Sequence, residues 1–277
     1  MRANKIFFSC VIFLSIPYFF GGSSTQAAVK IMPLGDSITQ GQSSGEPDTD
    51  RQISYRKALW DKLISGDYDV DFVGSLNSGS DILGFEAADH EGHNGFTADQ
   101  IRDEVFDWLQ LNFPDVVLLH VGTNDISGPQ PVPDIVSEVE DILDEIFIYS
   151  PEMTVILARI INRVTFSQKT NDFNNLLPGM VNGHPYKNRI KIVDMEVGAG
   201  MDYRIWPTGD MNDDIHPYQD PVSSETPGYD KMADVWFSAL QQVLPDPNPP
   251  PPDDPPSSSG GGGGGGCFIS AAGEDFL

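Results

Sequence analysis

Residues 31–41 read IMPLGDSITQG, a strand pattern that runs without a break into a glycine turn. The apolar run from Val29 to Leu34 has the length of a buried β-strand. Gly35, Asp36 and Ser37 follow directly, so a serine lies at the carboxyl end of that strand. Taken alone, the Gly-Asp-Ser string is more typical of a turn in which Asp36 or Ser37 caps the next helix.

Further runs of the same kind alternate with segments of helical period along the chain. The predicted strands are 29–34, 70–73, 116–121, 154–158 and 190–193. The predicted helices are marked by Leu59 and Leu63, by Ile101, Val105, Trp108 and Leu109, by Ile135, Val139, Ile142, Leu143 and Ile146, and by Tyr229, Met232, Trp236, Ala239 and Leu240. This alternation predicts an α/β fold, with a mostly parallel sheet that has helices on both faces. Ligands of such sheets bind at the carboxyl ends of the strands.

The composition narrows the class of partner. The 277 residues are 39% hydrophobic, which is enough for one sizeable core and excludes disorder throughout. The 41 acidic residues outnumber the 16 basic ones, and the formal net charge is -25. Such a field repels nucleic acid, phosphorylated ligands and anionic lipid headgroups. No nucleic-acid partner is expected, and a neutral or cationic substrate fits better.

The first 28 residues have the pattern of a secretory signal peptide. Two basic residues near the start precede an apolar run over residues 6–20, and small residues follow, so cleavage is expected after Ala27 or Ala28. A membrane span is the alternative, but the run is short and is broken by Pro17. The mature protein is therefore predicted to be secreted, in an extracellular or cell-surface location.

Residues 29–244 are predicted to form one catalytic domain. Residues 245–266 are rich in Pro and Asp and then in Gly, which is the composition of a disordered tether. The short tail, residues 267–277, resembles bacterial C-terminal sorting segments but lacks their hydrophobic helix and basic end, so attachment to the cell surface is left open. The two cysteines, Cys10 and Cys267, lie outside the domain and can form neither a disulfide nor a thiolate metal site within it.

A second polar motif precedes the last predicted helix. Asp213 and His216 are three positions apart. A serine hydroxyl becomes a good nucleophile when an imidazole accepts its proton, and the imidazole needs a carboxylate to fix its tautomer. Asp213 and His216 supply both groups for Ser37, although an isolated pair of this kind is also ordinary on a solvated loop.

Two further positions have the chemistry of an oxyanion hole. Asn124 follows the strand over 116–121, and Gly95 lies in the loop over 91–97 before a helix. Hydrogen-bond donors aimed at the developing oxyanion accelerate ester cleavage. Each position also has a structural explanation, Asn124 as a turn former and Gly95 as a glycine at a helix entry.

Together, these motifs resemble the four conserved blocks of the SGNH (GDSL-type) hydrolases, in the family's order. The blocks are Gly35–Ser37, Gly95, Gly122–Asp125 and Asp213–Pro217. The flanking sequence is similar to the acetylxylan esterases of carbohydrate esterase family 3, over about residues 29–243. The segments that carry this likeness are IMPLGDSITQG at 31–41, Ser54–Arg56, DFVGS at 71–75, HEGHNGFT at 90–97 and PDVVLL at 114–119.

The resemblance implies a three-layer α/β/α sandwich with a five-stranded parallel sheet of flavodoxin-like order. It implies Ser37 as nucleophile, His216 as general base and then acid, and Asp213 as the residue that orients His216. The backbone N–H groups of Ser37 and Gly95 and the side chain of Asn124 would form the oxyanion hole. No cofactor and no metal is implied. Asn94 departs from the family, in which a serine is more usual before the oxyanion glycine.

Other residues are weaker candidates. Asp36, His93 and Trp206 are predicted to contact substrate, His93 as part of the pocket wall and Trp206 as a platform for a sugar ring. His90, Glu91 and His93 lack the converging partners that a zinc site needs, and the acidic loop 210–214 lacks EF-hand spacing for calcium. His120 is expected to be a buried, hydrogen-bonded histidine.

These observations predict a secreted, monomeric serine esterase that removes O-acetyl groups from a polysaccharide such as xylan through an acyl-enzyme. One alternative is the same machinery acting on lipid or aryl esters. A second is a non-catalytic carbohydrate-binding module.

Overall fold

The structure is a computed structural model that describes residues 27–42, 48–83, 88–220 and 225–248. The predicted signal peptide up to residue 26 lies outside the described residues, as do the predicted tether and tail from residue 249 onward. Within the described ranges, no helix combines the length and the apolar character needed to span a lipid bilayer.

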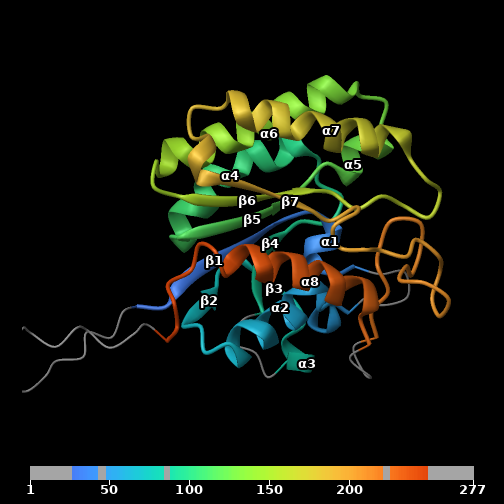
Figure 1. Cartoon of the computed structure of the whole chain (residues 1–277), viewed down its shortest axis with the longest axis horizontal. Coiled ribbons are helices and arrows are strands. Elements are labelled where there is room, and N and C mark those ends of the chain that lie inside the picture. The colour runs from blue at the N-terminus through green and yellow to red at the C-terminus, as the bar shows by residue number, and fades with distance from the viewer. Residues whose placement is uncertain (1–26, 43–47, 84–87, 221–224, 249–277) are drawn as a thin grey trace, which may run out of the picture.

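A twisted sheet forms the middle layer (Figure 1). Its strands are β1 (Val29–Gly35), β2 (Val70–Phe72), β3 (Leu76–Asn77), β4 (Asp89–Gly92), β5 (Val116–His120), β6 (Thr154–Arg159) and β7 (Ile190–Asp194). The hydrogen-bonded order is β3-β4-β1-β5-β6-β7, and β2 also pairs with β1. All five predicted strands are present, and the sequence does not predict β3 or β4.

The way in which β2 and β4 pair with β1 explains how the sheet keeps the predicted order of five parallel strands. β2 pairs with the first half of β1, with Val29 opposite Val70, whereas β4 pairs with its last residues, with Gly35 opposite Gly92. β2 and β4 therefore occupy one position, and the parallel positions run β2/β4, β1, β5, β6, β7. This is the predicted flavodoxin-like order, to which β3 adds a short antiparallel edge.

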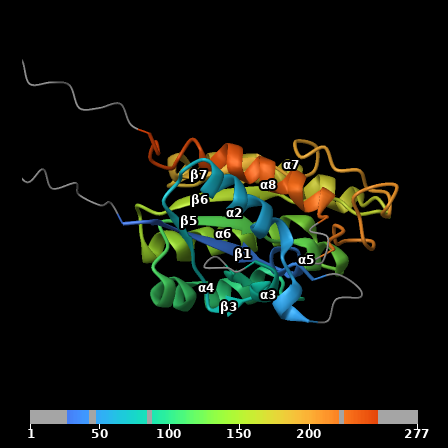
Figure 2. The same cartoon turned by 90° about the horizontal axis from the view of Figure 1, so that it is seen from below.

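Helices cover both faces of the sheet. They are α1 (Ser37–Gln40), α2 (Ser54–Ser65), α3 (Ser80–Leu83), α4 (Ala98–Asn112), α5 (Thr123–Ser127), α6 (Val132–Tyr149), α7 (Gln168–Gly183) and α8 (Pro227–Leu240), with 3₁₀ turns at Thr49–Arg51 and Lys187–Arg189. α4, α6 and α7 lie on one face, and α2 and α8 lie on the other (Figures 1 and 2). The predicted three-layer sandwich is confirmed, and α7 is the long helix that the sequence does not predict.

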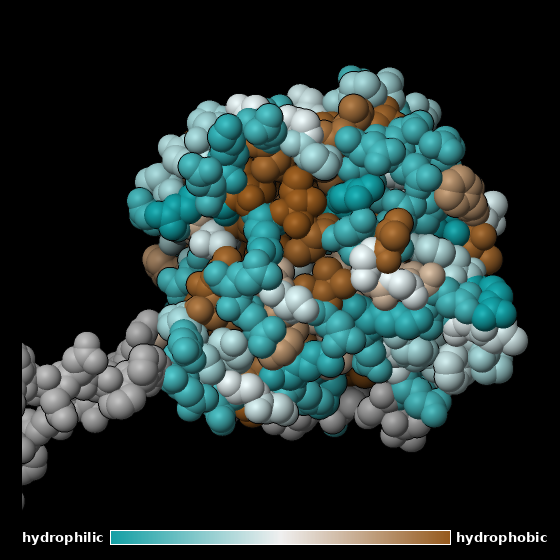
Figure 3. All heavy atoms as spheres, viewed as in Figure 1, coloured by the Kyte–Doolittle hydropathy of each residue, from teal (hydrophilic) through white to brown (hydrophobic). Residues whose placement is uncertain are grey.

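The sheet divides the hydrophobic core into two clusters, and successive side chains of β5 belong alternately to one cluster and the other. Val117 and Leu119 belong to the cluster beneath α4, α6 and α7, whereas Val116 and Leu118 belong to the cluster beneath α2 and α8. Successive side chains of a strand point to opposite faces, so β5 serves both cores. Figure 3 shows a largely hydrophilic exterior, with apolar atoms gathered over the β6–β7 edge between the two helical layers.

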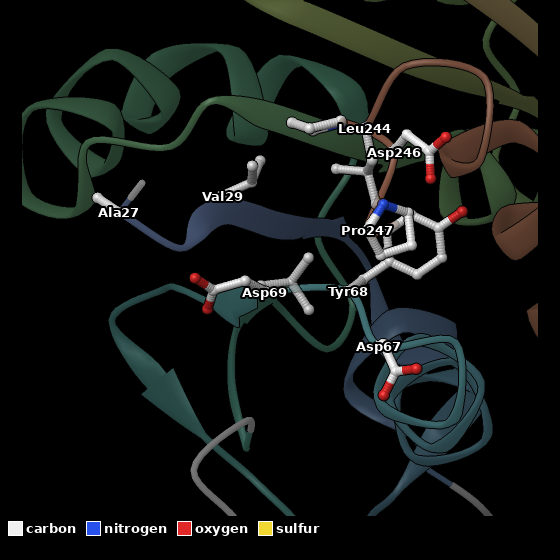
Figure 4. A pocket seen from close by; sticks show the side chains of 10 residues that line it. Ala27, Val29, Asp67, Tyr68, Asp69, Leu244, Asp246 and Pro247 are labelled. Carbon is white, nitrogen blue, oxygen red and sulfur yellow. The ribbon is translucent and has the colours of Figure 1, made fainter. Parts of the chain in front are cut away.

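The two ends of the described chain meet at one pole. Ala27 and Val29, before and in β1, line the same pocket as Leu244 and Pro247, which follow α8 (Figure 4). Tyr68 forms its floor, at the start of the turn into β2. The strands run from this pole, so their carboxyl ends, with α1 and the segment between β7 and α8, lie at the opposite pole (Figure 2).

Candidate active site

Ser37 is the first residue of α1 and follows β1 directly. Gly35 makes this turn possible, because a Cβ there would lie 2.2 Å from the carbonyl oxygen of His120 on the neighbouring strand. Asp36 caps the helix, and its carboxylate accepts a hydrogen bond from the Ile38 amide at 2.9 Å. Ser37 is thus held at a helix N-terminus by its own neighbours.

His216 and Asp213 meet Ser37 at this edge of the sheet. The distance from His216 Nε2 to Ser37 Oγ is 2.9 Å, across 179 positions of sequence. His216 Nδ1 lies 3.0 Å and 3.1 Å from the two carboxylate oxygens of Asp213. An ionised carboxylate only accepts hydrogen bonds, so Nδ1 carries the proton and the Nε2 lone pair faces the serine hydroxyl. This arrangement can withdraw the Ser37 proton.

The environment of Asp213 keeps its carboxylate charged. Burial acts to raise its pKa, but hydrogen bonds and electrostatic attraction from His216, together with backbone hydrogen bonds, outweigh burial. The backbone amides of Ile215 and His216 add bonds to Oδ1 at 3.0 Å and 2.9 Å. The pKa of Asp213 therefore lies well below its usual value, and the carboxylate stays available to orient His216.

Gln219 ties the His216 segment to the Ser37 segment. Its Oε1 accepts from the amides of Ile53 and Ser54, at 3.3 Å and 3.0 Å, and its Nε2 donates to the carbonyl of Gly41 at the end of α1. The side chain is buried, so these bonds are shielded from water. Sequence analysis does not single out Gln219, because nothing local distinguishes it from any other loop glutamine.

The predicted oxyanion donors come from neighbouring strand ends. Gly95 lies in a turn closed by the Phe96 amide donating to the His93 carbonyl at 3.1 Å. The φ of Gly95 is +82°, which favours glycine, and a Cβ there would have no heavy atom within 4 Å. Asn124 Nδ2 donates to the Phe96 carbonyl at 2.7 Å, and among the described residues nothing accepts from its second N–H, which can donate to a ligand. Gly35 is the register partner of both Gly92 and His120, so the loops after β1, β4 and β5 adjoin.

The predicted substrate contacts have different placements. Asp36 is fully buried as a helix cap, so its position does not fit direct contact with substrate and corrects that prediction. His93 stacks on Trp108 and contacts Phe96, with ring centroids 4.2 Å and 4.9 Å away, and the Trp108 and Phe96 centroids are 6.5 Å apart, so the three rings form one cluster. Trp206 is partly exposed and stacks on Tyr218 at 4.7 Å, within the segment that also carries His216.

His120 is buried as expected, but the expected hydrogen bonds are absent. Neither ring nitrogen has a hydrogen-bond partner within the part of the chain that the structure describes. Burial lowers the pKa of His120 to about 4, so the ring is neutral near pH 7. A neutral ring tolerates an apolar environment better than an imidazolium ion would.

The structure also separates the candidate metal ligands. His90 Nδ1 accepts from the Gly92 amide at 2.8 Å, whereas Glu91 binds His93 on another side. Asp210 of the acidic loop pairs with Lys231 at 2.6 Å. Within the described residues, one group of acidic side chains converges, with carboxylate oxygens that lie within 4.8 Å of one another. The sequence does not predict this group. It consists of Asp99, Asp125 and Glu138.

The chain matches a known protein family and several solved structures. Residues 34–220 match the GDSL-like Lipase/Acylhydrolase family, and the chain belongs to it. A carbohydrate esterase family 3 structure from Talaromyces cellulolyticus is 27% identical, with a TM-score of 0.62 over 78% of this chain and 97% of that one. A family 3 carbohydrate esterase from Clostridium thermocellum is 28% identical, with the same TM-score and coverage.

A curated relative supports the same class. The chain is 24% identical over 249 residues to a multidomain esterase of Ruminococcus flavefaciens. The match covers 80% of this chain but 30% of that protein, so the chain spans under a third of the relative's length. The chain thus belongs to a family of SGNH-type ester hydrolases, and it is similar in fold and sequence to family 3 carbohydrate esterases.

Proposed function

We propose that the protein is a secreted serine esterase that removes O-acetyl groups from a polysaccharide of the xylan type. The observation that carries this proposal is the continuous chain from Ser37 Oγ through His216 to Asp213, with contacts of 2.9 Å and 3.0 Å. Secretion rests on the sequence pattern of residues 1–28.

The proposed reaction has two steps. Ser37 Oγ attacks the acetyl carbonyl as His216 Nε2 takes its proton, and the sugar oxygen then leaves with that proton, which gives an acetyl-enzyme. Water, deprotonated by His216, attacks the acetyl carbon, and acetate leaves as Ser37 recovers its proton. The Ser37 and Gly95 amides and the free N–H of Asn124 would stabilise the oxyanion in both steps.

Several features support a sugar ester. The two carbohydrate esterases named above align with this chain over 97% of their own length. An acetyl esterase crystallised with an acetate ion is 25% identical to this chain, with a TM-score of 0.61. Trp206 lies in the segment that also carries Asp213 and His216, and it supplies an aromatic surface suited to the apolar face of a sugar ring. The strong negative charge favours a neutral polymer.

Replacing the nucleophile tests the proposal. Ser37→Ala removes the only atom that can form the acyl-enzyme, so acetate release from acetylated xylan should fall at least about 1,000-fold. Ser238→Ala, on the exposed face of α8, is the matched control and should keep full turnover. Near-normal acetate release by Ser37→Ala would refute the proposal. Faster cleavage of long-chain acyl esters than of acetylated xylan would assign the same machinery to lipids.

A further inference from the structure

Glu91, the third residue of β4, is a buried carboxylate held by several hydrogen-bond donors. Its side chain has no solvent exposure. It accepts from the Ser75 amide at 2.5 Å, the Ser75 hydroxyl at 3.0 Å, Asn112 Nδ2 at 3.2 Å and His93 Nε2 at 2.8 Å. No Lys or Arg pairs with it within the described ranges. Four donors from three other segments fix its position, and the reaction described above does not use it.

Glu91 in turn fixes the ring of His93. A hydrogen bond holds one edge of the ring, and two aromatic rings pack against it: the ring is nearly parallel to Trp108, at an interplanar angle of 7°, and lies at 28° to Phe96, which itself contacts Trp108. The His93 backbone amide also donates to the Gly35 carbonyl, two residues before Ser37, at 2.9 Å. His93 therefore has little freedom to rotate or shift.

His93 begins the turn that carries Gly95, one of the predicted oxyanion donors, and that contacts a second, Asn124. Gly95 lies at the apex, and the Asn94 amide donates to the Gln40 side chain at 3.2 Å, which joins the turn to α1. Phe96 ends the turn, and its carbonyl receives one N–H of the Asn124 amide. The orientation of the second Asn124 N–H consequently depends on where Phe96 lies, and Phe96 is stacked against His93.

We propose that Glu91 and His93 are positioning residues for the oxyanion hole. They hold the His93–Phe96 turn so that the Gly95 amide and the Asn124 side chain aim at the developing oxyanion. This inference rests on the proposed function. It concerns donors that act on the transition state, and it requires no contact between Glu91 and substrate.

Two variants test this role. Glu91→Gln keeps the shape but replaces one acceptor oxygen with a donor, and His93→Phe keeps the stacking but loses the bond to Glu91. Each should lower kcat about 10-fold or more, with KM unchanged within about twofold, because oxyanion donors act mainly in the transition state. The acid limb of the pH profile should stay in place, because His216 and Asp213 are untouched.

A double-mutant comparison separates this role from a general loss of structure. In an Asn124→Ala background, Glu91→Gln should have clearly less effect on kcat than in the wild type, because part of its action passes through Asn124. Asp144→Asn is the matched control: it removes the carboxylate from another buried histidine, His184, 3.2 Å away on the α6–α7 side. It should lower stability and leave kcat unchanged.

The rates are normalised to the sites that a fluorophosphonate labels, so unfolded protein is not counted. The inference is overturned if both variants keep normal kcat, if KM alone rises, or if Glu91→Gln lowers kcat by the same factor with and without Asn124. Should Glu91→Gln fail to fold, His93→Phe decides by the same criteria. Activity in Ser37→Ala would instead contradict the proposed function, so the two failures are distinguishable.

Discussion

Asp36 shows how one side chain next to the nucleophile serves the backbone. Its carboxyl group is fully buried, and burial raises its pKa from the usual 3.8 to about 6, although the Ile38 amide hydrogen bond opposes this shift. The folded state therefore binds this proton more tightly than the unfolded state. Stability contributed by Asp36 is greatest below about pH 4 and is lost as pH rises towards and beyond 6.

Asp36→Asn should abolish this part of the pH dependence. Asn keeps an oxygen that can cap α1 and cannot ionise. Between pH 4 and pH 7 the free energy of unfolding of the wild type should fall by about 2 kcal/mol relative to the variant, since two pKa units correspond to at most about 3 kcal/mol. Urea unfolding at a series of pH values measures the difference. Parallel curves for the two proteins would contradict the assignment.

The sequence predicts the reacting residues better than their supports. Ser37, Asp213 and His216 lie within hydrogen-bond distance, as their motifs predict. For Asp36 the sequence leaves two roles open, a cap of the next helix and a contact with substrate, and the structure shows the cap. The partners of Glu91 come from segments far apart in the sequence and have no pattern of their own.

Among the elements, the contact between α1 and the β7–α8 segment is the one on which the site depends most. Gln219 makes this contact and is buried against the end of α1. Its loss would leave the amides of Ile53 and Ser54 and the carbonyl of Gly41 without their bonds. Unsatisfied buried groups cost about 1–3 kcal/mol each.

Gln219→Leu should therefore lower both stability and turnover. We expect a loss of about 2–4 kcal/mol in the free energy of unfolding, and a fall of about 10-fold in kcat as the His216 Nε2 to Ser37 Oγ contact loosens. Gln219→Glu keeps an acceptor for the two amides and should lie between Leu and wild type. Thermal unfolding and acetate release provide the readouts. Unchanged kcat in Gln219→Leu would show that the two segments hold their places without it.

The sequence does not predict α7 or β4, and the composition of each explains why. The apolar positions of α7, Phe173, Leu177 and Val181, are separated by asparagines and by an internal Pro178, so the helical period is weak. β4 contains the buried polar residues His90 and Glu91 and has no apolar run. By contrast, α6 has an uninterrupted apolar face and is predicted directly.

At the scale of the whole molecule, charge should govern the choice of polymer. The net charge of -25 repels polyanions over distances comparable to the Debye length. For an acetylated polysaccharide rich in uronic acids, kcat/KM should rise several-fold between low and high salt. For neutral acetylated xylan it should change little. Equal salt responses for the two polymers would show that the field at the site differs from that of the chain as a whole.

The two ends of the described chain meet beside Tyr68 (Figure 4), at the pole opposite the carboxyl ends of the strands (Figure 2). A segment or domain joined to either end would therefore be attached at the pole opposite the Ser37 site. If the protein were attached through that pole, the Ser37 site would face away from the point of attachment. Such an orientation suits a polymer that stays in place, because the catalytic groups are then turned towards it.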